Sequence, residues 1–224
     1  MITVGDVMNM RAFDSIWLAT PCDGAAAREV TGVGTLDHEP FTGGYEVFTQ
    51  GEFVFTTLGF AGVHPDLAEE ALLALIDCGV AAVVVKPVVL KELPPTVVQA
   101  SAARGVPVFF YEGRYMERVI ADLMNLLDDD AAEWERNHLI DLILAPSDEH
   151  AVRSTFFTIA GVTGATIQCL AIRPVTDDGA SLRALQKVVE GVLADYGERW
   201  DDVERTFVCR YREMLLGFVS FKRP

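Results

Sequence analysis

Six polar or flexible residues follow three predicted strands, close to the point where each strand ends. They are Thr56, Thr57, Gly59, Lys86, Glu112 and Arg114. Hydroxyls, one ammonium, one carboxylate and one guanidinium suit the recognition of a polar metabolite, either anionic or ureide-like. Gly59 adds a backbone that tolerates a positive φ or the close approach of a ligand. The sequence therefore predicts a small-molecule site formed by these six residues.

Each of these residues also has a purely structural explanation. Threonines at strand ends often cap the following turn, which would account for Thr56 and Thr57. Gly59 could serve only the bend of the chain, and Lys86 could extend its ammonium into water from a strand end. The residue types alone leave both explanations open.

The sequence carries none of the common catalytic motifs. It has no GxxxxGK[ST] loop, no GxGxxG after a strand, no GxSxG elbow and no HExxH helix. Acid–base catalysis needs paired titratable groups in different environments, and Glu52 begins its strand, so it lies at the opposite edge from Lys86 and Glu112. We therefore predict a binding protein with no catalytic residues and no cofactor.

The four histidines are far apart in the sequence, at positions 38, 64, 138 and 150. Asp37, His38 and His64 could meet near the loops of the sheet and bind a metal ion. Single histidines in loops are more often solvated polar residues. The sequence therefore predicts no metal site.

Three strands alternating with two helices would position the polar residues. The strands are predicted at 53–57, 80–86 and 106–111, and the helices begin at Pro65 and Pro94 and end at Gly79 and Gly105. Strands joined by right-handed helical crossovers are parallel. In parallel sheets ligands bind outside the carboxyl ends of the strands, where the six residues fall.

The flanking segments are less regular. We predict a short helix over residues 2–10 with Thr3 as its cap, and strands at 15–19 and 29–36. Residues 114–145 predict one long helix or two, because an acidic run at 128–130 interrupts the apolar stripe. This helix either packs on its own sheet or pairs with its copy in a dimer.

A second unit is predicted to begin near Ser154. A strand at 165–172, a helix at 181–196 capped by Ser181, and strands at 203–210 and 215–221 give a β-α-β-β order. This order is the opening part of a ferredoxin-like or cyclase-like domain, so the ending at Pro224 suggests a fragment of a longer protein. The predicted divisions are a domain at 1–125, a connecting helix at 126–150 and a partial domain at 151–224. The overall fold class is α/β with a partial α+β unit.

The composition excludes several classes of partner. The net charge is −15, from 18 basic and 33 acidic residues, which argues against binding to nucleic acid or to an anionic membrane. The longest apolar run, residues 80–85, is far shorter than the ~20 residues that span a bilayer, and no signal peptide is visible. Four scattered cysteines suit reduced thiols in a cytoplasmic protein.

Five segments in a fixed order resemble the amino-terminal domain of PucR-type bacterial transcription regulators, the purine-catabolism-regulator family. They are Ile2-Thr3-Val4, Gly44-Tyr45-Glu46-Val47-Phe48, the stretch from Gly51 to Thr57, the stretch from Gly79 to Lys86, and Gly105-Val106-Pro107-Val108. The resemblance covers about residues 1–125. It implies a regulatory domain, followed in that family by a degenerate GGDEF-like cyclase domain and a carboxyl-terminal helix-turn-helix.

The rest of the chain fits the second part of that arrangement. Residues 211–214 fall where a true diguanylate cyclase would carry GGDEF, and nothing of that motif is present, so nucleotide cyclisation is not implied. The helix-turn-helix is missing, so we expect no direct DNA binding by these residues. The resulting hypothesis is a ligand-sensing, homodimerising fragment of a regulator of a catabolic pathway. The alternatives are a structural dimerisation module with no ligand, in which the Thr-Thr loop is an interface, and a small α/β enzyme.

Overall fold

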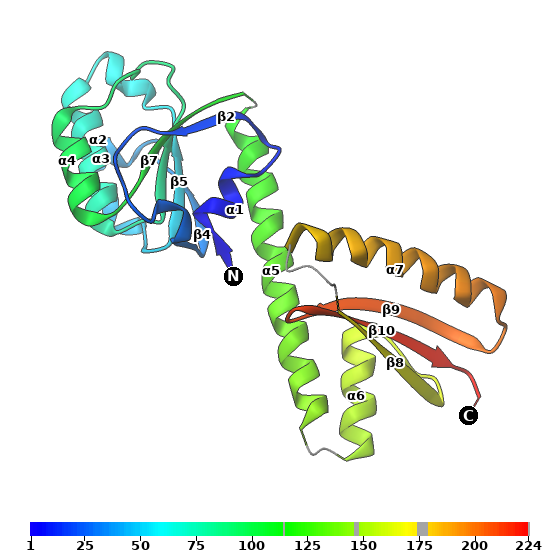
Figure 1. The fold of residues 1–224 in the computed structure, drawn as a ribbon. Coiled ribbons are helices and arrows are strands. Elements are labelled where there is room, and N and C mark those ends of the chain that lie inside the picture. The colour runs from blue at the N-terminus through cyan, green and yellow to red at the C-terminus, as the bar shows by residue number, and fades with distance from the viewer. Residues whose placement is uncertain (114, 146–147, 174–178, 224) are drawn as a thin grey trace. The chain divides into compact units, whose positions relative to one another are not determined.

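The computed structural model describes residues 1–113, 115–145, 148–173 and 179–223, and it divides the chain into two compact units (Figure 1). The units are Met1–Asp130 and Ala131–Pro224. The boundary between them falls inside one long helix, α5 (Met116–Leu144).

A five-stranded sheet forms the centre of the first unit, and the predicted α/β class is confirmed. Its strands, in spatial order, are β2 (Phe13–Leu18), β7 (Val108–Gly113), β6 (Ala82–Val85), β5 (Glu52–Thr56) and β4 (Gly32–Thr35). The last four are parallel, as predicted for the three of them that follow residue 51, whereas β2 is antiparallel to β7. The predicted strand at 29–36 is in fact two strands. Its first part, β3 (Glu29–Val30), pairs instead with β1 (Ile2–Thr3).

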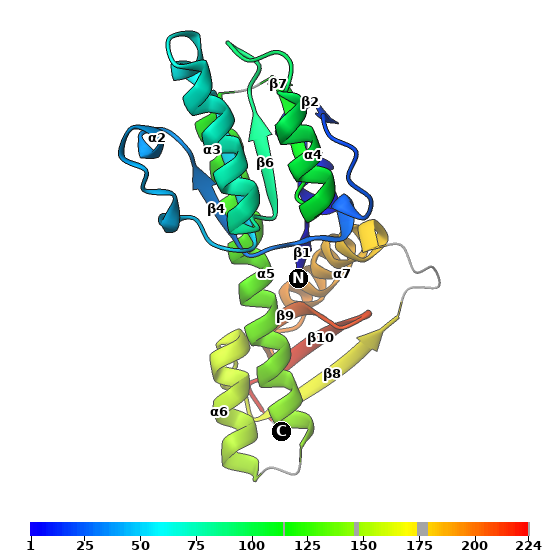
Figure 2. The same cartoon turned by 90° about the vertical axis from the view of Figure 1, so that its left-hand side faces the viewer.

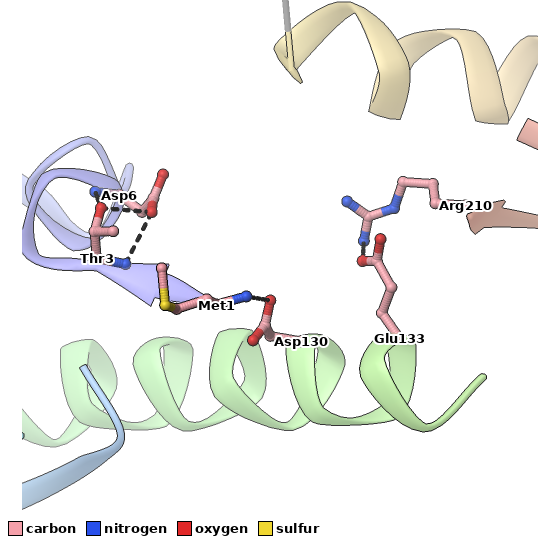
Figure 3. A network of polar contacts seen from close by, with 6 residues as sticks. All are labelled: Met1, Thr3, Asp6, Asp130, Glu133 and Arg210. Atoms are coloured by element: carbon pink, nitrogen blue, oxygen red, sulfur yellow. Dashed lines mark hydrogen bonds and ion pairs between the residues drawn. The ribbon is translucent and has the colours of Figure 1, made fainter. Parts of the chain in front are cut away.

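Short sequence signals set the helices of the first unit. The helices are α1 (Val4–Met8), α2 (Glu39–Thr42), α3 (Pro65–Cys78) and α4 (Pro95–Arg104), with single 3-10 turns at Ala25–Ala27, Tyr45–Val47 and Gly59–Gly62. Thr3 caps α1 in a reciprocal capping box with Asp6 (Figure 3). Gly79 and Gly105 end α3 and α4 with φ values of 74° and 66°, which glycine adopts without the penalty of a Cβ atom.

The alternation of side chains along the strands gives the sheet two buried faces. Val54, Val85 and Phe110 belong to the core under α3 and α4, and Figure 2 shows these two helices on the same side of the sheet. Phe55 and Tyr111 belong to the core on the other face, with α1 and the first half of α5. Burial on both faces explains why these strands read as continuous apolar runs.

Helix α5 is one continuous helix of 29 residues, not two. Val119 and Leu123 are fully buried against the sheet of the first unit, and Ile140 is buried in the core of the second unit. The acidic run at 128–130 does not break the helix. The carboxylate of Asp130 forms an ion pair with the amino-terminal ammonium of Met1, at 2.6 Å (Figure 3).

The second unit has a three-stranded antiparallel sheet between helices. Its elements are α6 (Glu149–Ala160), β8 (Thr166–Ile172), α7 (Gly179–Arg199), β9 (Val203–Tyr211) and β10 (Met214–Phe221), and the spatial order of the strands is β8-β10-β9. The predicted β-α-β-β order is confirmed. Helix α6 was not predicted, and α7 begins two residues before Ser181, its predicted cap. One face of the sheet packs on α5 and α6, and the other on α7.

Candidate ligand site at the carboxyl ends of the strands

Thr56 ends β5 with its side chain fully buried. Its hydroxyl oxygen accepts a hydrogen bond from the backbone N–H of Leu58 at 3.0 Å. Leu58 has a φ of 46°, in the left-handed region that non-glycine residues rarely adopt. The Thr56 hydroxyl therefore stabilises the turn after the strand, and this is the capping role that the residue type allowed.

The next residues of the loop lie nearer the surface. Thr57 is half-buried and Gly59 is exposed at the start of a 3-10 turn. The φ of Gly59 is not positive, because the left-handed position falls on Leu58 instead. A Cβ atom at Gly59 would meet only the Thr57 hydroxyl, at 3.4 Å. Glycine is thus not required here by backbone conformation, although the open backbone remains accessible to a ligand.

Lys86 follows β6 and faces the other side of the sheet from Thr56. Val83 and Val85 belong to the core that contains Val54, so the alternation of the strand places Lys86 with Tyr111. The Lys86 ammonium lies over the rings of Tyr111 and Tyr115, at 5.8 and 5.9 Å from the ring centroids. Both distances are within the range of cation–π attraction.

Tyr111 is a buried polar residue that the sequence did not single out. Its ring is fully buried, and its hydroxyl finds no hydrogen-bond partner among the residues that the structure describes. Burial, together with the negative charge of Glu117, raises the pKa of Tyr111 to about 12. The phenol is therefore neutral and retains hydrogen-bonding capacity beside the Lys86 ammonium.

The end of β7 brings a further carboxylate to this edge. Glu112 is exposed, and its backbone pairs with Ser15 of β2. Gly113 has a φ of 123°, and a Cβ atom there would lie 2.7 Å from a carboxylate oxygen of Asp14. Asp14 thus packs against the strand end at a position that only glycine can occupy. The predicted residue Arg114 lies outside the described residues.

The predicted residues therefore lie in two different environments, one on each face of the sheet. The Thr56 hydroxyl is inside the protein on the α3 and α4 face, whereas Lys86 meets Tyr111 and Tyr115 on the α5 face. The Lys86 ammonium can attract an anion, and the exposed ring of Tyr115 can present a face to a planar group, while Tyr111 is buried behind them. Strand alternation could have identified Tyr111, because it places Lys86 and Tyr111 on the same face of the sheet.

Among the cavities bordered by described residues, three open ones lie away from the strand ends and are lined by none of the predicted residues. One of about 340 Å³ is bordered by Arg28, Glu29, Thr31, Gln50 and Gly51. A second cavity, of about 330 Å³, lies between residues 10–12 and α5. A third, also of about 330 Å³, lies between α6 and the start of β8. Arg28 is already engaged there, because its guanidinium donates to the backbone carbonyls of Gly79, Val80, Ala81 and Gly105.

The histidines near the carboxyl edge contact an aromatic ring. The rings of His38 and His64 lie 5.7 and 5.9 Å from that of Phe41. Within the described part of the chain, no group of three or more His, Cys, Asp or Glu side chains is arranged to hold a metal ion.

No helix in the described ranges is both long enough and apolar enough to cross a membrane. Comparison of the chain with protein-family models finds no match, and comparison with curated proteins finds none either.

Proposed function

We propose that this chain is the ligand-sensing and dimerising regulatory part of a cytoplasmic bacterial transcription regulator of the PucR type. The observation that carries the proposal is the direct connection between the strand-end residues and α5. Tyr115, which contacts Lys86, immediately precedes the first residue of this helix. The same helix contributes Val119 to one core and Ile140 to the other.

The proposed ligand is a small polar metabolite with an anionic or ureide-like group. The Lys86 ammonium would attract the charged or strongly polar group, and the exposed Tyr115 ring would stack on a planar part of the ligand. Thr57, Gly59 and Glu112 would complete the site from the neighbouring strand ends. The association of the resembling family with purine breakdown makes purine catabolites the first compounds to test.

A ligand can act as a signal only if it binds two arrangements of the protein with different affinity. We propose that contact with Tyr115 changes the position or order of the first turn of α5. Because the helix is continuous, this change would reach residues 131–144 in the second unit. No catalytic step is involved.

The hairpin between β9 and β10 supports a regulatory role for the second unit. The Tyr211 hydroxyl donates to a carboxylate oxygen of Asp141 at 2.5 Å, and Arg212 donates to the same oxygen at 2.9 Å. The hairpin residues thus bind α5, at the place where a cyclase would carry its signature. A second ion pair, between Arg210 and Glu133, joins the same strand to the same helix (Figure 3).

A thermal-shift screen tests the sensing proposal. Purine catabolites, amino acids and small organic acids are added to the wild-type protein, to Thr57→Val with Lys86→Ala, and to Lys91→Ala as a surface-lysine control. A ligand at saturating concentration should raise the Tm of the wild type and of the control. The double variant should lose that rise. An equal rise in the double variant would place the ligand elsewhere.

The structural-module alternative is favoured by one observation. Val63 and Val88, beside the Thr-Thr loop and after Lys86, are 77% and 61% exposed. Exposed apolar side chains in neighbouring loops can form a protein interface. If the double variant alters self-association but no compound raises the Tm of any of the three proteins, the loop is an interface and not a sensor.

A further inference from the structure

A β-bulge at Asp14 brings a carboxylate to the end of β7. The pairing of β2 with β7 shifts between Phe13 and Ser15, so Asp14 is the extra residue of the bulge. A bulge turns one side chain away from the regular alternation of its strand. The Asp14 carboxylate consequently lies beside Gly113, where a Cβ atom would be only 2.7 Å from one of its oxygens. The end of β7 is therefore bordered by a negative charge.

The first turn of α5 carries a second carboxylate. A helix N-terminus attracts anions, because its backbone N–H groups and its dipole present partial positive charge there. Glu117 lies in this first turn, and its negative charge helps to raise the pKa of the nearby Tyr111. The position at which an anionic ligand would gain most from α5 is thus already supplied with a negative charge by the protein.

The two tyrosine rings beside α5 already hold a cation. The Lys86 ammonium lies 5.8 Å from the ring centroid of Tyr111 and 5.9 Å from that of Tyr115. Aromatic ring faces attract ammonium groups at such distances, and here the protein itself supplies the ammonium. A cationic ligand that approached these rings would therefore meet a like charge.

We propose that the site at Lys86 selects an uncharged, planar compound in which a carbonyl group is flanked by N–H groups, such as a cyclic urea or amide. Lys86 would donate a hydrogen bond to the carbonyl oxygen, and the exposed ring of Tyr115 would stack on the planar ring. The carboxylates of Asp14 and Glu117 would accept hydrogen bonds from the N–H groups and repel an anion. This selectivity rests on the proposed sensing function, and it narrows the ligand from an anionic or ureide-like compound to the second class.

Three probes that share one ring test the charge selectivity. Uracil is uncharged at neutral pH, orotate is the same ring with a carboxylate, and aminomethyluracil is the same ring with an ammonium group. Isothermal titration calorimetry of the wild-type chain should give the lowest Kd for uracil. A lower Kd for either charged probe would overturn the proposal, and so would the absence of binding by all three.

Neutral variants of the two carboxylates give a second readout. Asp14→Asn and Glu117→Gln keep the size of an exposed side chain and remove one negative charge each. Each should raise the affinity for orotate relative to uracil by about threefold, the effect of one unit charge ~6 Å away in a water-like medium. Glu29→Gln, at an exposed position beside Gly51 at the amino end of β5, is the matched control and should leave this ratio unchanged. A ratio that neither carboxylate variant changes would also overturn the proposal.

The ratio of the two Kd values separates this selectivity from a purely structural role of the carboxylates. A loss of stability alone would weaken the binding of every probe alike and would leave the ratio as it is. If orotate binds more tightly than uracil, and Thr57→Val with Lys86→Ala still abolishes the ligand-induced rise in Tm, the sensing proposal stands and the selectivity fails. If no compound in the sensing screen raises the Tm, the proposed function itself fails.

Discussion

Thr56 ends β5 and Lys86 directly follows the adjacent parallel strand β6, yet the two side chains lie on different faces of the sheet. The Thr56 hydroxyl accepts the Leu58 N–H inside the protein, and this bond holds the turn that leads to the exposed part of the loop. The Lys86 ammonium lies against the rings of Tyr111 and Tyr115 on the other face. The first residue therefore serves stability, and the second is the one that we propose for recognition.

Replacement of Thr56 separates these roles. Thr56→Val keeps the shape of the side chain but leaves the buried Leu58 N–H without its acceptor, so we expect a loss of about 1–3 kcal/mol of stability. Thr57→Val, at the half-buried neighbour, should change the free energy of unfolding by less than about 0.5 kcal/mol. Urea denaturation measures both. Equal effects of the two substitutions would show that the Thr56 hydrogen bond does not hold the turn.

Cys209 is predicted to be chemically inert in the folded protein. The residue is fully buried, and burial raises its pKa from 9.0 to about 11. At neutral pH this shift lowers its thiolate fraction about a hundredfold, and the thiolate is the nucleophile. Iodoacetamide followed by peptide mapping should find Cys209 unmodified until urea unfolds the second unit. Rapid alkylation under native conditions would contradict the buried position of this side chain.

Sequence reasoning reached the strand ends but not the faces of the sheet. Lys86 and Glu112 could be placed near the carboxyl edge because parallel strands end at a common edge. The burial of Thr56 and the participation of Tyr111 depend on which helices cover each face, and that is decided by packing between segments far apart in the sequence. Asp14 could not be predicted either, because it reaches the site through the antiparallel pairing of β2 with β7.

At the scale of elements, the loop before β8 is fixed by one glycine. A Cβ atom at Gly164 would lie 2.5 Å from the carbonyl oxygen of Phe221 and 2.7 Å from a carboxylate oxygen of Glu204. Gly164→Ala should therefore cost about 1–3 kcal/mol through overpacking. Gly191→Ala is the matched control. No atom outside the helix backbone lies within 4 Å of a Cβ atom there, so it should stabilise α7 by about 0.5–1 kcal/mol. Urea denaturation of both variants checks the opposite signs.

The contact between the β9–β10 hairpin and α5 should depend on pH. The hydrogen bond from Tyr211 lowers the pKa of Asp141 below 3.8, and the charge of Arg212 acts in the same direction. A carboxyl with a lowered pKa stabilises the folded state above its unfolded pKa, and this contribution is lost as the pH falls through the folded value.

Thermal unfolding of the wild type and of Asp141→Asn tests this contribution. The variant should have the lower Tm at pH 7, and the difference should shrink as the pH falls below about 4 and the wild-type carboxyl becomes protonated. A difference in Tm that is constant from pH 7 to pH 3 would mean that the ionised carboxylate does not hold the hairpin.

The elements that sequence reasoning placed well have explicit start and stop residues. Helices α3 and α4 begin with proline and end before glycine. The positive φ values of Gly79 and Gly105 show why glycine is needed there. Helix α6 was missed although Asp148 caps it by accepting the Ala151 N–H. The second unit was predicted to begin near Ser154 with a strand as its first element, so no helix was expected over these residues. The split of residues 29–36 into two strands depends on pairing with β1, which the local sequence does not reveal.

At the scale of the whole molecule, the proposed transmission of a ligand signal depends on α5. It is the one described helix with residues in the cores of both units, and its first residue directly follows Tyr115. If a ligand at Lys86 acts through this helix, residues beyond the first unit must respond to it. This consequence distinguishes a sensor from a protein that binds a metabolite without transmitting the event.

Hydrogen exchange measured by mass spectrometry tests this claim most directly. The compound that gives the largest thermal shift is added to the wild type and to Thr57→Val with Lys86→Ala. We predict altered exchange in the wild type both at residues 116–123 and at residues 131–144, and no change at either segment in the double variant. Altered exchange confined to the strand ends, with residues 131–144 unaffected, would contradict transmission through α5.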